Sequence, residues 1–204
     1  MKRIFTAIIV SMMVMTSCNN GGQMSKEAAT QAVLDNIAER KSVRSYTSEQ
    51  VPDEMVEKLL RAAMAAPSAM NRQPWEFVVV KDRAVLDDLA GRLKYAKMLS
   101  QAPMAIVVCS ETMITLSDGT KVENNFWEHD ASAATQNILL AAEAMGLGAV
   151  WTASSDEPRC TIVKEALGIP GTIKPLCVIP IGFPAGDDQP KDKWKPEKIH
   201  YEKW

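Results

Sequence analysis

The chain has 204 residues, with 23 Lys and Arg against 25 Asp and Glu and a formal net charge of −2. This length fits one domain with a sizeable core. The absence of a basic balance or a basic stripe argues against a nucleic-acid partner. The 4 cysteines have no metal-ligand spacing and the 2 histidines are far apart, which argues against a disulfide framework and against a zinc site.

The first residues have the pattern of an export signal. A charged start precedes an apolar run, Ile4 to Met15, that is too short to span a bilayer as a stable anchor. Small residues then lead to Cys18, which resembles a bacterial lipoprotein signal with this cysteine acylated, although Met15 and Ser17 depart from the commonest pattern. A simple secretory peptide with an incidental Cys18 is the alternative. We expect a signal peptide over residues 1–17, a tether over 18–24, a domain over 25–204, and an exported protein anchored to the membrane only through lipidated Cys18.

Helical patterns then alternate with continuous apolar runs. Ser25 is a suitable N-cap for a helix that ends at Glu39, and apolar residues at helical spacing predict a second helix from Asp53. Apolar runs without alternation predict buried strands. In chain order we predict strands over 77–80, 104–109, 149–151 and 176–181, two short helices within 82–100, and helices over 130–145 and 158–167.

A polar insert, residues 112–125, interrupts this order and contains the tight-turn signal Ser117-Asp118-Gly119-Thr120. Strands separated by helices indicate a mixed α/β layer and not a sandwich. No Gly-x-Gly-x-x-Gly follows the first predicted strand, and helices dominate the start of the chain. Both facts argue against a nucleotide-binding Rossmann fold.

Two polar stretches carry the chemistry. Arg40-Lys41-Ser42-Val43-Arg44 places two guanidiniums four residues apart with a hydroxyl between them, which suits a dianionic phosphate. A solvated basic turn at the end of a helix is the alternative for this stretch. The second stretch runs from Pro67 to Trp75, and its Asn71 and Gln73 carry the paired donors and acceptors that suit the edge of a heterocycle.

In order, spacing and residue type, these two stretches resemble those of the nitroreductase family of flavin enzymes, and the resemblance extends over residues 36–204. It implies an α+β fold with a mixed sheet flanked by helices, built as an intertwined homodimer with FMN at the interface. It also implies that Lys193-Trp194-Lys195-Pro196 adds cations to the FMN phosphate, although lysines at both places lose bidentate contact. A solvated tail is the alternative, but the aromatic residues of the tail favour a tail that covers a surface.

The cofactor-binding residues implied by the resemblance surround the FMN phosphate at one end and line its ribityl and ring groups at the other. For the segment 146–148, a simple helix stop is the alternative. Phe126 and Trp127 either cap the substrate pocket or belong to the core. The full set is Arg40, Lys41, Ser42, Arg44, Pro67, Ser68, Ala69, Asn71, Gln73, Leu147, Gly148, Trp151, Ser154, Lys193 and Lys195.

The resemblance implies an oxidoreductase with a ping-pong mechanism, in which NAD(P)H donates hydride and a small aromatic acceptor, such as a nitro compound or a quinone, is reduced. Because a flavin carries the chemistry, no catalytic side-chain set and no metal is expected. Glu128, His129 and Asp130 are adjacent at a helix start and are expected to splay outward. Export leaves the donor open. The alternatives are an exported flavin-binding lipoprotein without turnover, and a family variant that catalyses dehalogenation or ring oxidation.

Overall fold

A computed structural model describes residues 25–204. The predicted signal peptide and the whole predicted tether, Cys18 included, lie outside these residues. A sheet of 5 strands has the order β1-β2-β7-β5, with β6 also pairing with β7. All of its pairs within the described residues are antiparallel. The strands are β1 (Trp75–Val80), β2 (Met104–Glu111), β5 (Gly148–Ala149), β6 (Thr152–Ala153) and β7 (Ile173–Gly182).

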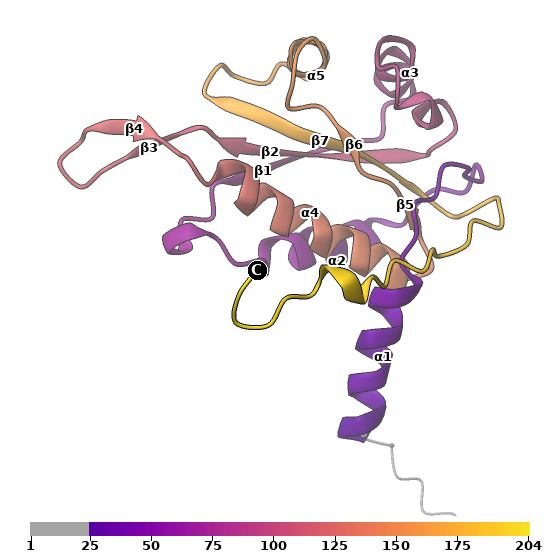
Figure 1. Cartoon of the computed structure of the whole chain (residues 1–204). Helices are drawn as coiled ribbons and strands as arrows, with labels where there is room; N and C mark the ends of the chain where they lie inside the picture. Colours follow the sequence, from indigo (N-terminus) through magenta and orange to yellow (C-terminus); the bar gives the residue numbers. More distant parts are fainter. Residues whose placement is uncertain (1–24) are drawn as a thin grey trace, which may run out of the picture.

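Helices cover both faces of this sheet (Figure 1), and a separate hydrophobic core fills each side. The residues of β2 alternate between the two cores, so that Ile106 packs toward α2 and α4 while Val107 packs toward α3 and α5. This double burial explains why β2 reads as one continuous apolar run. The helices are α1 (Lys26–Glu39), α2 (Asp53–Met64), α3 (Arg83–Arg92), α4 (Trp127–Ala144) and α5 (Arg159–Leu167), with short 3₁₀ turns η1 (Ala69–Asn71), η2 (Lys97–Ser100) and η3 (Pro196–Lys198).

The α+β fold is confirmed, with differences at particular elements. The polar insert forms a hairpin of β3 (Met113–Thr115) and β4 (Lys121–Glu123), which projects beyond the sheet in Figure 1. The strand predicted over 149–151 is divided into β5 and β6, because Val150 and Trp151 do not pair with β7. Helix α4 begins at Trp127, ahead of the predicted start at 130.

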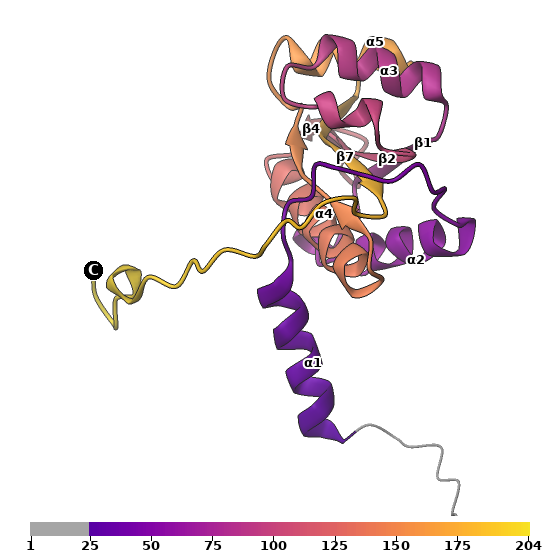
Figure 2. The same cartoon turned by 90° about the vertical axis from the view of Figure 1, so that its right-hand side faces the viewer.

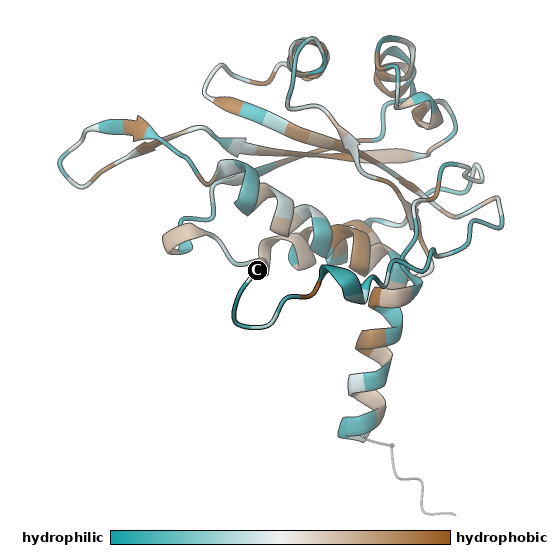
Figure 3. Ribbon diagram, viewed as in Figure 1, coloured by the Kyte–Doolittle hydropathy of each residue, from teal (hydrophilic) through white to brown (hydrophobic). Residues whose placement is uncertain are grey.

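Helix α1 and the C-terminal tail stand away from the rest of the described chain (Figure 2). No residue of α1 is buried, and Val33, Leu34 and Ile37 are 60%, 55% and 50% exposed. The hydropathy colours of Figure 3 show hydrophobic segments on α1 as well as along the central strands. An isolated helix of this length is only marginally stable in water, so α1 needs a surface to pack on. Within residues 25–204, no helix is long and apolar enough to cross a bilayer.

Candidate functional site

A basic cavity lies where the first polar stretch meets the C-terminal tail. Its volume is about 200 Å³, and Arg40, Ser42, Arg44 and Lys193 line it together. These residues are distant in sequence, so the fold brings two of the three predicted segments to one place. The remaining lining residues are Lys41, Asp188, Gln189 and Lys191, while Lys195 lies farther along the exposed tail, just before η3.

The first polar stretch is held in place by the end of the sheet. The amide of Val43 donates to the carbonyl of Ala149 at 3.1 Å, and its side chain packs directly over Gly148. A Cβ on Gly148 would lie 2.6 Å from Val43 Cγ1, so only glycine allows this approach. The hydroxyl of Tyr46 lies 2.7 Å from the carbonyl oxygen of Val43 and 3.1 Å from that of Pro180, and burial raises the pKa of this phenol above its usual range. The hydroxyl therefore stays protonated and donates to this stretch.

The cations of the cavity are not equivalent. Lys41 Nζ pairs with Glu143 Oε1 of α4 at 2.7 Å, with both side chains largely buried, so its charge is already compensated. Arg44 donates from Nη1 to the carbonyl of Ser42 at 3.3 Å, and its other donors have no hydrogen-bond partner in the part of the chain that the structure describes. Arg40 forms no ion pair within residues 25–204. The two arginines are therefore the groups best placed to bind an anion.

The second polar stretch forms a tight turn at η1. Ser68 Oγ accepts from the amide of Gln73 at 2.9 Å, and Gln73 Nε2 donates to Asn71 Oδ1 at 3.0 Å. Met70, Asn71 and Gln73 have φ angles of 53°, 52° and 53°. A left-handed conformation costs a residue other than glycine about 1–2 kcal/mol. This turn is therefore strained, as expected where a backbone is shaped for a ligand.

The sequence-based prediction for Asp130, the acidic residue beneath this turn, was wrong. Glu128 and His129 are exposed as predicted, but Asp130 is buried, at 4% exposure, instead of splaying outward. The spacing of Asp130 to the buried Ala134 and Ile138 places all three on the inner face of α4, which is the signal that could have located it. Asp130 Oδ1 accepts from the amide of Ala69 at 2.8 Å.

The loop between α4 and β6 contributes mainly backbone. Leu147 is 2% exposed and belongs to the core, Gly148 is in β5, and the half-buried Trp151 packs against the same core. Ser154 is fully buried, its amide donates to the carbonyl of Leu176 at 2.9 Å, and its Oγ has no partner among residues 25–204. The predicted Leu147 side chain therefore has a structural role, whereas the Ser154 hydroxyl is an unsatisfied polar group.

Phe126 and Trp127, at the start of α4, have different environments. Phe126 is 51% exposed and meets His129 edge-on, with ring centroids 6.0 Å apart. Trp127 packs against the core, and Lys174 Nζ lies 5.1 Å from the centroid of its ring. Of the two, Phe126 is the residue that is free to cover a bound molecule.

The two polar stretches are attached to opposite ends of α4. The basic cavity is linked to its C-terminal end through Lys41 and Glu143, whereas the strained turn is linked to its N-terminal end through Ala69 and Asp130. At ~1.5 Å per helical residue, Asp130 and Glu143 are about 20 Å apart along the helix axis. Figure 1 shows this separation, with the turn before β1 and the end of α1 near opposite ends of α4.

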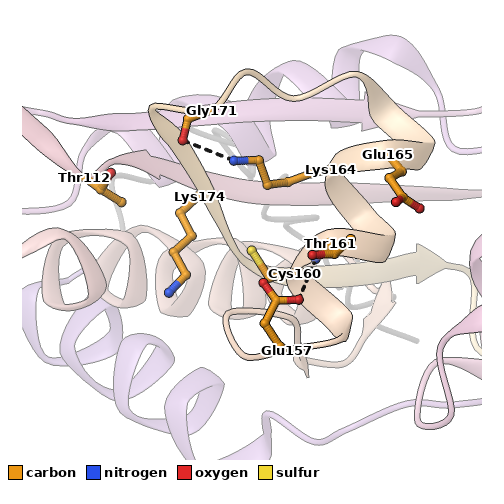
Figure 4. Close-up of a pocket in the computed structure, with 8 residues that line it drawn as sticks. All are labelled: Thr112, Glu157, Cys160, Thr161, Lys164, Glu165, Gly171 and Lys174. Carbon is orange, nitrogen blue, oxygen red and sulfur yellow. Dashed lines mark hydrogen bonds between the residues drawn. The ribbon is translucent and has the colours of Figure 1, made fainter.

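Another cavity, of about 350 Å³, lies beside α5 and contains none of the predicted site residues (Figure 4). Its polar groups largely satisfy one another. Lys164 donates to the carbonyl of Gly171 at 3.2 Å, and Glu157 accepts from the amide of Thr161 at 3.2 Å. Cys160 is buried beside them, and burial raises the pKa of its thiol, so it is not an activated nucleophile.

A family profile described as the nitroreductase family matches residues 37–94 and 90–183, more than half of the chain. The chain belongs to the nitroreductase family. A crystal structure from Bacteroides thetaiotaomicron, with the provisional name NADH dehydrogenase/NAD(P)H nitroreductase, is 51% identical, with a TM-score of 0.79 over 85% of this chain and 98% of that one.

Other relatives span a wider range. A Methanothermobacter thermautotrophicus protein with the same provisional name is 41% identical over 84% of this chain and 87% of its own length. A Desulfovibrio desulfuricans protein with the provisional name nitroreductase, crystallised in complex with FMN, is 31% identical, with a TM-score of 0.69 over 84% of this chain and 97% of that one. An iodotyrosine deiodinase of Haliscomenobacter hydrossis is 28% identical over 83% of this chain and 88% of its own length.

Proposed function

We propose that this protein is an FMN-dependent oxidoreductase that works as a homodimer and passes hydride equivalents from NAD(P)H to a small electron-poor aromatic acceptor. The observation that carries the proposal is the basic cavity, because Arg40, Ser42, Arg44 and Lys193 converge there from both ends of the domain. The family membership and the relative crystallised with FMN support the same cofactor.

The residues of the basic cavity fit the phosphate of FMN. Arg40 and Arg44 supply planar donor pairs that match phosphate oxygens, Ser42 supplies a hydroxyl, and Lys193 adds a point charge. Lys41 compensates Glu143 and holds the stretch against α4 instead of binding the phosphate itself. The single acidic residue of the cavity, Asp188, leaves a cationic excess.

The strained turn fits the edge of the flavin ring. Its amide side chains, on Asn71 and Gln73, are exposed and offer both donors and acceptors. The unsatisfied Ser154 hydroxyl is a further polar group that a bound cofactor could satisfy. When bound, FMN supplies the two-electron chemistry, and the chain's own residues bind it, orient it and exclude water.

A second copy of the chain would complete the site. The two polar stretches sit at opposite ends of α4, so an antiparallel pairing of two α4 helices brings the basic cavity of one protomer to the strained turn of its partner. An open apolar groove of about 600 Å³ between α1, α2 and α4 supplies the surface for this pairing, lined by residues such as Val33, Ile37, Leu140 and Ala141. Trp194, Tyr201 and Trp204, which are 72%, 79% and 100% exposed on the tail, require a surface to cover.

The test is the absorbance spectrum of protein expressed without its first eighteen residues. We expect yellow, dimeric protein whose flavin absorbance is bleached anaerobically by NADH or NADPH and restored by a nitroaromatic compound or a quinone. Protein that purifies colourless and does not take up added FMN contradicts the proposal. Yellow protein that reacts with neither donor nor acceptor identifies a flavin-binding protein without turnover.

The deiodinase relative gives a specific reason to test a second acceptor. Iodide release from an iodinated phenol by the reduced protein, with no reduction of nitroaromatics, would assign dehalogenation instead. Export is proposed separately, from the pattern that ends at Cys18. If the protein is exported, either its donor in the cell is a reduced carrier other than NAD(P)H or its substrate is not the usual one of the family. Slow reduction of the purified protein by NAD(P)H would favour the first of these.

A further inference from the structure

The turn that carries Asn71 and Gln73 is held from below by one carboxylate. Asp130 is 4% exposed, and its Oδ1 accepts from the amide of Ala69 at 2.8 Å. Its Oδ2 is also buried, and it has no hydrogen-bond partner in the part of the chain that the structure describes. A buried carboxylate oxygen without a donor destabilises the fold, so this arrangement calls for a functional explanation.

The same turn has the most strained backbone of the site. Met70, Asn71 and Gln73 are all left-handed, with φ angles of 53°, 52° and 53°. Such conformations persist where the surroundings over-determine them, and they cluster at ligand-binding sites. The contacts of Ser68 and Gln73 shape the turn internally, whereas the bond from Ala69 to Asp130 ties it to α4.

We propose that Asp130 is a positioning residue for the cofactor: it holds the turn of residues 68–73, with its left-handed Met70, Asn71 and Gln73, in place and so presents Asn71 and Gln73 to the edge of the flavin ring. This inference rests on the proposed function, because the ring edge is the assumed ligand of the turn. Asp130 does not touch the ligand in this account. Its effect is to keep the turn in its binding conformation before the ligand arrives.

The first test compares two substitutions of Asp130. Asp130→Ala removes the acceptor. If the binding conformation of the turn is then populated about a tenth of the time in the ligand-free variant, the dissociation constant of FMN should rise about tenfold. Asp130→Asn keeps an oxygen at the position of Oδ1, and we expect rescue to within about twofold of wild type. The matched control is Glu128→Ala, which removes an exposed acid from the same first turn of α4 and should change nothing.

The ligand pair FMN and riboflavin locates the effect. Because Asp130 positions the turn that faces the ring edge and not the phosphate, Asp130→Ala should weaken the binding of riboflavin by the same factor as the binding of FMN. A general loss of structure would instead lower the melting temperature of the ligand-free protein together with its binding. Hydrogen exchange of the amides of residues 68–73 should accelerate in ligand-free Asp130→Ala, with little change in the central strands.

A second variant removes the same bond from the other side. Ala69→Pro removes the backbone N–H that donates a hydrogen bond to Asp130. Proline fits at this position because Ala69 is the first residue of η1 and Ser68 before it is extended, with φ −137° and ψ 156°. We expect a similar loss of flavin binding. The double variant Asp130→Ala with Ala69→Pro should bind flavin as tightly as the single variant that binds it less tightly, because both substitutions remove the same hydrogen bond. If Asp130→Ala does not fold, Ala69→Pro and Asp130→Asn carry the test.

The outcomes separate this inference from the function. Wild-type protein that binds flavin, with Asp130→Ala and Ala69→Pro binding equally tightly, overturns the positioning role alone. Unchanged hydrogen exchange in the turn, or additive effects in the double variant, also overturns it. Wild-type protein that binds neither FMN nor riboflavin overturns the proposed function, and this inference with it.

Discussion

The two arginines of the basic cavity should differ in their contribution to FMN binding, and the difference follows from their exposure. Arg44 is exposed and makes one weak contact, at 3.3 Å to the carbonyl of Ser42, whereas Arg40 is half-buried at the end of α1. A hydrogen bond to a charged group contributes about 1.5–3 kcal/mol, and the contribution is larger where water is excluded. Arg44→Ala should therefore weaken FMN about tenfold, and Arg40→Ala closer to a hundredfold.

Riboflavin, which lacks the phosphate, provides the internal reference. Neither substitution should change the dissociation constant of riboflavin, measured by quenching of flavin fluorescence on titration with ligand-free protein. The loss for Arg44→Ala should also shrink at high salt, because the Debye length falls from about 10 Å at 0.1 M to about 3 Å at 1 M. The melting temperature of ligand-free protein should stay close to that of wild type for Arg44→Ala, since Arg44 is on the surface.

The control for these variants is Arg61→Ala on α2, where an exposed arginine pairs with Glu57 at 2.7 Å and is not among the lining residues of the cavity. It should bind FMN as wild type does. If Arg40→Ala and Arg44→Ala both hold FMN as tightly as wild type, the cavity is a solvated basic turn. If they weaken FMN and riboflavin equally, the arginines support the fold and do not bind a phosphate.

Four further outcomes are expected, three for residues that the structure describes and one for the sequence pattern that ends at Cys18. Glu143→Ala leaves the half-buried Lys41 without its carboxylate partner. The free energy of unfolding should fall by about 1–2 kcal/mol, a value between those of exposed and buried ion pairs, and the melting temperature should fall by about 2–8 °C. An unchanged melting curve would show that the ion pair does not stabilise the fold. Burial raises the pKa of Tyr46, so the stability that depends on its neutral phenol is fully present below the pKa of about 10 that the phenol has in the unfolded chain, and it is lost as the pH rises above that pKa. In denaturant titrations between about pH 9 and 11, the free energy of unfolding should therefore decline less for Tyr46→Phe than for wild type. Truncation after Ala185 should lower dimer stability and flavin occupancy together, and a truncated chain that stays yellow and dimeric in sedimentation would show that the tail is dispensable. Wild-type protein should partition into detergent and Cys18→Ser into the aqueous phase, whereas equal partitioning of both into the aqueous phase would refute lipidation.

Helices and central strands were predictable because their signals are local and repeated. The apolar spacing of α2 and the unbroken apolar run of β2 each contain several residues that agree on one period. The division into β5 and β6 was not predictable, because a two-residue strand has too few positions to show a period. The hairpin within 112–125 was missed for a related reason, since its strands of three residues are mostly exposed and only its turn at Gly119, with φ 86°, is marked in the sequence.

The sequence predicts which residues form the candidate site, and this assignment stays a prediction; their arrangement in space could not be predicted. The motif residues could be assigned to a phosphate or to a ring by their chemistry, but nothing in the local sequence distinguishes Lys41, which pairs with Glu143, from the arginines beside it. Asp130 was misplaced because three adjacent polar residues at a helix start read as a solvated turn. Burial is decided there by the helical face that Asp130 shares with Ala134 and Ile138, and a pattern of charge alone does not show that face.

The position of Gly148 connects the fold to the site. The basic stretch can lie against β5 only because Gly148 has no side chain, and a Cβ there would approach Val43 Cγ1 to 2.6 Å. This contact fixes the basic cavity at the C-terminal end of α4, while Asp130 fixes the strained turn at the other end, about 20 Å away along the helix. Under the proposed function, one α4 would therefore carry the phosphate half of one site and the ring half of another. Under the proposed two-fold pairing, each flavin would be held by two chains, so that losing the dimer interface and losing the cofactor would be the same event.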